Sequence, residues 1–116
     1  MDLEHRPVEG TPGLSILALH GEFVTDELPE VSQQVDALIE SGQYRLIVNL
    51  HELEFIESLP LGFLIKTQRR LKKNNGEVVL SQPSPFLQTA INTLGLDHAF
   101  RVFPTDEQAL EHFGGG

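Results

Sequence analysis

The chain has 116 residues, a length that supports one hydrophobic core and therefore one domain. Hydrophobic residues make up 40% of it and charged residues 22%, the balance of an ordinary globular protein. Seventeen acidic residues against eight basic ones give a net charge of −9. Phosphate backbones repel such a protein, so we expect no nucleic-acid partner.

The chain contains no cysteine, which excludes disulfides, thiolate zinc sites and cysteine nucleophiles. The N-terminal MDLEHRPVEG lacks the pattern of a signal peptide, and no apolar stretch reaches the roughly 18 residues that span a bilayer. We therefore expect a cytoplasmic protein without direct membrane insertion. No repeat or linker divides residues 1–116, so we expect a single domain that ends in a frayed tail, Gly114–Gly116.

Two strand patterns open the chain. A weak one covers residues 3–8, and a clearer alternation of apolar residues predicts a strand over residues 14–20, stopped by Gly21. The segment TDELPEVSQQVDALIESG then predicts a helix, because its apolar residues recur at helical spacing. These residues are Leu28, Val31, Val35, Leu38 and Ile39. Thr25 or Asp26 is expected to cap this helix, and Gly42 to end it.

The run YRLIVNL, residues 44–50, is typical of a strand that is covered on both faces. We expect it to leave the sheet as a loop, HELEFIES, with the next helix beginning near Pro60. Leu61, Leu64, Ile65 and Leu71 continue that helix at the right spacing.

The last third repeats the pattern. EVVL, residues 77–80, predicts a buried strand, and Ser84 is the expected cap of a third helix that ends at Gly95. Its apolar residues are Phe86, Leu87, Ala90, Ile91 and Leu94. FRVF predicts a last short strand, followed by a capping box of Thr105 and Gln108.

Strands that alternate with helices of about ten to fifteen residues predict right-handed βαβ units. The expected fold class is therefore α/β: a single domain with a mainly parallel, mixed sheet of about four to five strands and about four helices.

The stretch FIESLPLGFL, residues 55–64, places a small polar pair, Glu57 and Ser58, between a strand and a helix. In α/β folds, sites lie beyond the carboxyl ends of the strands. Ser58 is expected just outside the helix, near the positive end of its dipole, where a phosphate would be stabilised. From spacing alone, a serine that simply caps or borders the helix is the more common explanation of the pattern.

Several motifs together resemble a STAS domain of the bacterial anti-sigma factor antagonist type, over about residues 14–113. They are HGEF, LIVNL, FIES with the following LG, RRLKKNNGEVVL and LQTAINTLGLDHAFRVFPTDEQAL. The resemblance implies a non-enzymatic protein-binding module without cofactors. It also implies two partners. One is an anti-sigma factor that is also a serine kinase, and the other is a phosphatase that removes the phosphate from the modified residue.

In that family a junction of aspartate, serine or threonine, serine and Gly-Leu-Gly carries the phosphoacceptor. Matched to it, Ser58 falls on the phosphoacceptor, Glu57 on the aspartate, and Leu61–Gly62 on the closing Leu-Gly. Leu59 and Pro60 replace the second serine and the glycine.

Two further departures lie outside this junction. Val24 stands where an acidic residue often follows the first strand, and Asn49 where an aspartate often ends the central one. The expected partner-binding residues are six, from the junction and the neighbouring loop: Glu57, Leu59, Pro60, Gly21, Glu22 and Phe23.

The departures leave room for a second hypothesis, a phosphorylation-independent STAS adaptor or a subunit of a larger signalling or transporter-associated complex. A third, a small hydrolase, rests only on the neighbouring carboxylates Glu54 and Glu57.

Two other sets of residues are candidates for a functional site. The basic segment KTQRRLKKNN is either a site for an acidic partner or the solvated end of a helix, where the dipole favours cations. Five scattered histidines lack the spacing of a metal site, so we expect no metal: His5, His20, His51, His98 and His112.

Overall fold

The computed structural model describes residues 1–114. Its strands are β1 (Asp2–Pro7), β2 (Leu14–Phe23), β3 (Arg45–Ile56), β4 (Glu77–Ser81) and β5 (Val102–Phe103). Its helices are α1 (Leu28–Glu40), α2 (Ser58–Lys72), α3 (Pro85–Thr93) and α4 (Asp106–His112), with two 3-10 turns, η1 (Thr25–Glu27) and η2 (Leu96–His98). Residues 115 and 116 of the expected frayed tail lie outside the described residues.

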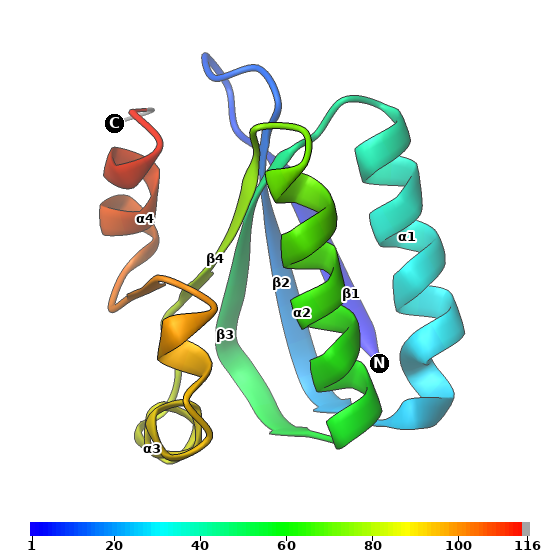
Figure 1. Ribbon diagram of the computed structural model, residues 1–116, viewed down its shortest axis with the longest axis vertical. Helices are drawn as coiled ribbons and strands as arrows, with labels where there is room; N and C mark the ends of the chain where they lie inside the picture. Colours follow the sequence, from blue (N-terminus) through cyan, green and yellow to red (C-terminus); the bar gives the residue numbers. More distant parts are fainter. Residues whose placement is uncertain (115–116) are drawn as a thin grey trace.

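The five strands form one sheet in the order β1-β2-β3-β4-β5. β1 runs antiparallel to β2, and every other neighbouring pair is parallel. A helix connects each parallel pair in turn, as the alternation of patterns indicated (Figure 1). The predicted fold class is confirmed: one α/β domain with a mixed, mainly parallel sheet and four helices.

Helices cover the sheet unequally on its two faces. The larger core cluster joins buried side chains of α1, α2 and α3 to one face, among them Val35, Leu64 and Ile91. A smaller cluster on the other face centres on Ala109 of α4, which packs with Ile47 and other sheet residues. Figure 1 shows α1 and α2 side by side in front of the sheet and α4 at its edge.

β2 and β3 run further than the sequence predicted. Gly21 lies inside β2 with a φ of 90°, beside an irregularity in the register, rather than ending the strand. β3 continues through the expected loop to Ile56, although β4 pairs with it only as far as Asn49. Beyond that point β3 pairs only with β2, so most of its side chains are exposed. The polar residues of this part are why the sequence predicted a loop there.

Gln68 completes the sheet where β5 is too short to cover the edge of β4. Its Nε2 donates to the carbonyl oxygens of Val78 and Ala99, both at 2.9 Å, and its Oε1 accepts from the N–H of Val78 at 2.7 Å. The side chain is buried, so these bonds replace water for three backbone groups. Gln68 thereby fixes α2 to the sheet.

α4 is anchored through its first residue, Asp106. The Asn49 Nδ2 atom donates to both Asp106 carboxylate oxygens at 3.0 Å, and the Ser81 hydroxyl donates to one of them at 2.6 Å. Asn49 and Ser81 are both buried. A carboxylate at the start of a helix also interacts favourably with the helix dipole. Both the hydrogen bonds and the dipole therefore stabilise α4 on the sheet.

Most of the predicted helix ends are confirmed. The Ser84 hydroxyl accepts from the N–H of Leu87 at 3.2 Å, and the Thr105 hydroxyl accepts from that of Gln108 at 3.1 Å. Gly42 and Gly95 have positive φ directly after α1 and α3. The predicted cap of the first helix is wrong: a 3-10 turn precedes α1, and neither Thr25 nor Asp26 caps it.

The longest helix, α2, has 15 residues. Within residues 1–114, no helix combines the length and the apolar character needed to cross a membrane.

Candidate docking site at the start of α2

Ser58 is the first residue of α2, and Glu57 before it is extended, with φ −82° and ψ 168°. The sequence placed Ser58 outside the helix and Pro60 at its first position, so this expectation is wrong by two residues. Pro60 is instead the third helical residue. The first four N–H groups of a helix have no partner within it, so a proline is tolerated there too.

The Ser58 side chain lies on the surface. Ser58 is exposed, and among the described residues no side-chain hydrogen bond involves its hydroxyl. Leu59 beside it is 64% exposed. A hydroxyl and an apolar side chain are therefore available together at the positive end of α2.

Glu57 connects this junction to the start of α1. Its Oε1 accepts a hydrogen bond of 2.6 Å from the N–H of Thr25, and its own N–H donates to the carbonyl oxygen of Phe23 at 3.0 Å. The carboxylate thus accepts from the first N–H of η1, the 3-10 turn that precedes α1. Both bonds fix the β2–α1 connection against the β3–α2 connection.

The same contact defines the ionisation of Glu57. Hydrogen bonds from the Thr25 backbone N–H and then from its hydroxyl hold the pKa of the Glu57 carboxyl below its usual range. A general acid needs the opposite, a raised pKa. Glu57 is therefore a charged, structural carboxylate near Ser58.

The paired ends of β2 and β3 form the neighbouring surface. Glu22 pairs in register with Phe55, and Phe23 pairs with Ile56. Glu22 is exposed and Phe55 is 43% exposed, so both side chains are accessible. Phe55 was absent from the predicted site because its segment read as a loop.

Two of the predicted contact residues are not at the surface. Phe23 has no exposed area and Pro60 is fully buried, so neither is available to a partner. Phe23 alternates with the exposed Glu22 along β2 and points into the core. Four of the six predicted contact residues remain, Glu57, Leu59, Gly21 and Glu22, beside the candidate phosphoacceptor Ser58.

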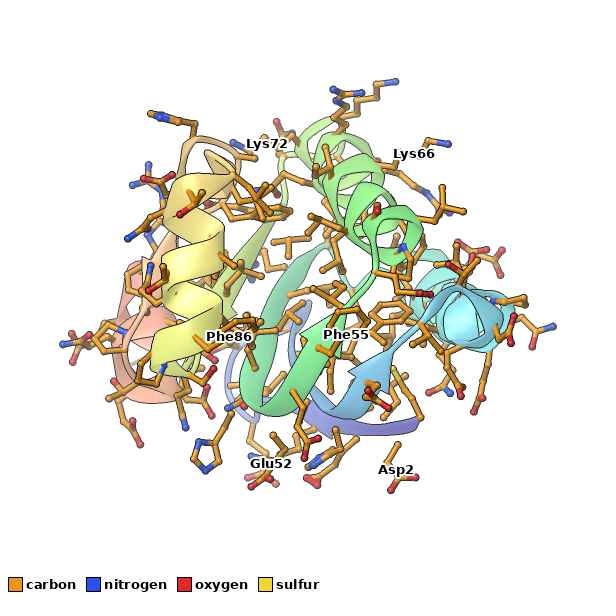
Figure 2. All side chains as sticks on the ribbon, turned by 90° about the horizontal axis from the view of Figure 1, so that it is seen from below. Asp2, Glu52, Phe55, Lys66, Lys72 and Phe86 are labelled. Atoms are coloured by element: carbon orange, nitrogen blue, oxygen red, sulfur yellow. The ribbon has the colours of Figure 1, made fainter. Side chains whose placement is uncertain are left out.

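An apolar cavity adjoins this surface, between α2, α3 and the ends of β3 and β4. Its volume is about 160 Å³, and it is lined only by leucine, isoleucine, phenylalanine and alanine. Figure 2 shows Phe55 and Phe86 facing each other across its mouth. Phe86 and Leu94, two of the apolar residues that predicted the third helix, are 69% and 63% exposed. The buried face of α3 is too narrow to cover all the apolar side chains in and next to this helix, so some of them remain exposed.

The basic segment lies on the outer side of α2. Thr67, Gln68 and Leu71 face inward, and the cations are exposed: Lys66, Arg69, Arg70, Lys72 and Lys73. Arg70 forms an ion pair with Asp36 of α1. Three of the cations occupy the last turn of α2, where the dipole favours them.

The histidines are dispersed. His112 lies 2.7 Å from a Glu77 carboxylate oxygen, and His5 lies 3.0 Å from the Ser15 hydroxyl. Within residues 1–114, no group of three or more potential ligands is placed to hold a metal ion.

Comparison with known proteins matches the STAS domain to residues 5–109. The anti-sigma F factor antagonist of Lysinibacillus sphaericus is 27% identical over 101 residues, 86% of each chain.

Solved structures share the fold. The anti-sigma factor antagonist SpoIIAA, in its unphosphorylated form, has a TM-score of 0.77 at 20% identity, with 99% of this chain and 100% of that chain covered. SpoIIAA has also been solved in its phosphorylated form. A sulfate transporter family protein from Wolinella succinogenes has a TM-score of 0.74 at 24% identity, with 88% and 85% covered. With a family match that spans most of its length, the chain belongs to the STAS domain family.

Proposed function

We propose that this protein is a non-enzymatic, cytoplasmic binding module of the anti-sigma factor antagonist type. Its partner is an anti-sigma factor that is also a serine kinase. The partner docks on Ser58, Leu59 and Glu22, with Phe55 at the edge. The observation that carries the proposal is the exposed Ser58 hydroxyl at the head of α2, beside a leucine that is 64% exposed.

The similarity to named antagonists supports this proposal. The Lysinibacillus sphaericus relative is an antagonist of an anti-sigma factor, and SpoIIAA exists in unphosphorylated and phosphorylated forms. The resemblance of the FIES motif and the following LG to the family's junction implies that Ser58 takes the place of the phosphoacceptor. An exposed leucine next to it provides the apolar anchor that protein interfaces commonly contain.

Phosphorylation of Ser58 would release the partner by electrostatics. A phosphoserine adds about −1.5 to −2 charge at pH 7. In the free protein the N-terminus of α2 stabilises that charge. In the complex the phosphate would have to lose water while lying beside the Glu57 carboxylate, which Thr25 keeps ionised. A phosphatase would restore the binding form.

Intact-mass measurement tests the modification. The protein is incubated with ATP and the candidate anti-sigma kinases of its source organism, and we expect a gain equal to one phosphate group. Ser58→Ala should abolish the gain. Ser41→Ala is the matched control, because Ser41 is also exposed but lies after α1. A gain that survives Ser58→Ala, or no gain with a kinase that binds, would contradict the switch.

An adaptor that works without phosphorylation is the second candidate. The observation that favours it is the pair that follows Ser58: Leu59 is bulky and exposed, and Pro60 is fixed in the core. STAS domains also occur in transporters, as the Wolinella succinogenes protein indicates, so a larger signalling or transporter-associated complex is a suitable setting. Equal partner binding by Ser58→Ala and Ser58→Asp would favour this candidate.

The hydrolase hypothesis has the least support. Glu54 is exposed on β3, and the Glu57 carboxylate is held ionised by Thr25. The apolar cavity has no carboxylate in its lining. Acid–base catalysis by this pair would need one raised pKa.

A further inference from the structure

The cavity between α2 and α3 has features that partner docking at Ser58 does not require. Its floor is formed by Leu50, Leu53 and Leu80, near the carboxyl ends of β3 and β4. In open α/β sheets this is the edge at which ligands bind. Phe55 and Phe86 flank the opening (Figure 2).

The size of the cavity indicates what it can hold. Its volume is about 160 Å³. An apolar cavity of about 150 Å³ in another protein stays dry and binds benzene. The void is therefore large enough for one ring or one short alkyl chain. It is too small for a cofactor or a drug-sized ligand, whose pockets begin near 300 Å³.

The surroundings of the cavity indicate a neutral ligand. No charged residue occurs in residues 58–65 of α2 or in residues 82–96, which include α3. The charges next to these segments in the sequence are Glu57 before the first, Lys66 after it and Asp97 after the second, and none of the three lines the cavity. With a net charge of −9 on the whole chain, a carboxylate ligand would be repelled.

α3 is the element that a ligand would stabilise. Only Leu87 and Ile91 of this helix are buried, while Phe86 and Leu94 remain exposed. Side chains that line a void lack contacts on one side. A ligand in the cavity would supply those contacts to α2, α3 and the sheet together.

We propose that this cavity is a binding site for a small, neutral, apolar molecule of about six to eight carbons, an aryl ring or a short alkyl chain. The site does not require phosphorylation of Ser58. It adjoins the docking surface through Ile56 and Leu61, which line it on either side of Ser58.

Titration of toluene and hexan-1-ol into the labelled protein, followed through the NMR signals of leucine and isoleucine methyl groups, tests this. We expect saturable shifts at Leu61, Leu87 and Ile91. Leu14 and Ile47, in the cluster on the other face of the sheet, should not shift and serve as the internal reference. Hexanoate should bind about tenfold more weakly than hexan-1-ol, because the lining has no polar or charged side chain to pair with its carboxylate.

Ala90→Leu fills the cavity from α3 and should weaken binding of both neutral probes by about tenfold or more. Thr93→Leu is the matched control, because Thr93 is exposed on the same helix and does not line the cavity. Leu61→Phe fills the cavity from α2 and replaces Ala90→Leu if that variant unfolds.

Four results would overturn the proposal. They are shifts that do not saturate, equal shifts at the reference methyl groups, unchanged binding in both filling variants, and hexanoate binding as tightly as hexan-1-ol. Analytical ultracentrifugation at the same protein concentration should show a monomer, which would exclude a second copy of the chain as the occupant of the cavity. A dimer that Phe86→Ser dissociates would also overturn the proposal.

Discussion

The Glu57 carboxylate and the N–H of Thr25 are joined by a hydrogen bond of 2.6 Å, although 32 residues separate them in the chain. The bond holds the start of η1 against the start of α2. The site that carries Ser58 is therefore built from two connections fixed to each other, and not from one mobile loop.

Glu57→Gln should lower the melting temperature at pH 7 and change its dependence on pH. The folded pKa of Glu57 lies below its ordinary value of 4.5, so its contribution is complete above about pH 4.5 and is lost as the pH falls through the folded pKa. The difference in melting temperature between wild type and variant should shrink below that pH. Thermal unfolding monitored by circular dichroism across pH 3–7 measures it.

Glu54→Gln is the control for this series, since Glu54 is an exposed glutamate three residues before Glu57, on β3. It should change the melting temperature little at any pH. A Glu57→Gln difference that stays constant between pH 7 and pH 3 would refute the role of the Thr25 contact.

Ser58→Asp should weaken binding to an identified kinase partner by at least about tenfold. The added carboxylate would face the partner beside the Glu57 carboxylate. Like charges placed together in an interface reduce the binding free energy by several kcal/mol. Ser58→Ala should bind like wild type and resist inactivation by ATP. Calorimetry with the purified partner measures both affinities, and wild-type affinity in both variants would disprove the switch.

Leu59→Ala should reduce partner affinity without affecting the fold. Leu59 is 64% exposed, so the free energy of unfolding should change by less than about 0.5 kcal/mol. An apolar anchor in an interface contributes about 1–2 kcal/mol, which corresponds to roughly a five- to thirtyfold weaker affinity. Leu94→Ala is the control of nearly equal exposure, at 63%, directly after α3. Equal losses in the two variants would contradict a docking centre at Ser58.

The sequence predicted those parts of the fold that follow from local pattern. Alternation of strands with helices gave the fold class, and Ser84, Gly95 and Thr105 act at helix ends because their chemistry is local. The outer half of β3 was missed because only its pairing with β2 makes it a strand. Strand pairing is a long-range contact, so the local sequence of the outer half of β3 does not predict it.

The candidate site was predictable in position but not in detail. Ser58 lies at the expected junction, yet the helix begins two residues earlier than expected, with Pro60 in the core and Leu59 in solvent. The exposure of Phe86 and Leu94 depends on how few residues of α3 the sheet can cover, which requires the packed structure. Glu57 acts on Thr25, a contact that no local pattern in either segment indicates.

Asn49 stands where the resemblance to the family implied an aspartate, and its contacts explain why an aspartate would not fit here. The Asn49 Nδ2 atom donates to both Asp106 oxygens at 3.0 Å, so Asn49→Asp would place two carboxylates together near the core. We expect the free energy of unfolding, measured by urea denaturation, to fall by about 3 kcal/mol. Asn92→Asp, at an exposed asparagine of α3, should change it by less than about 0.5 kcal/mol. The double variant N49D/D106N restores an amide–carboxylate pair and should recover most of the loss, whereas additive losses would show that the pair does not anchor α4.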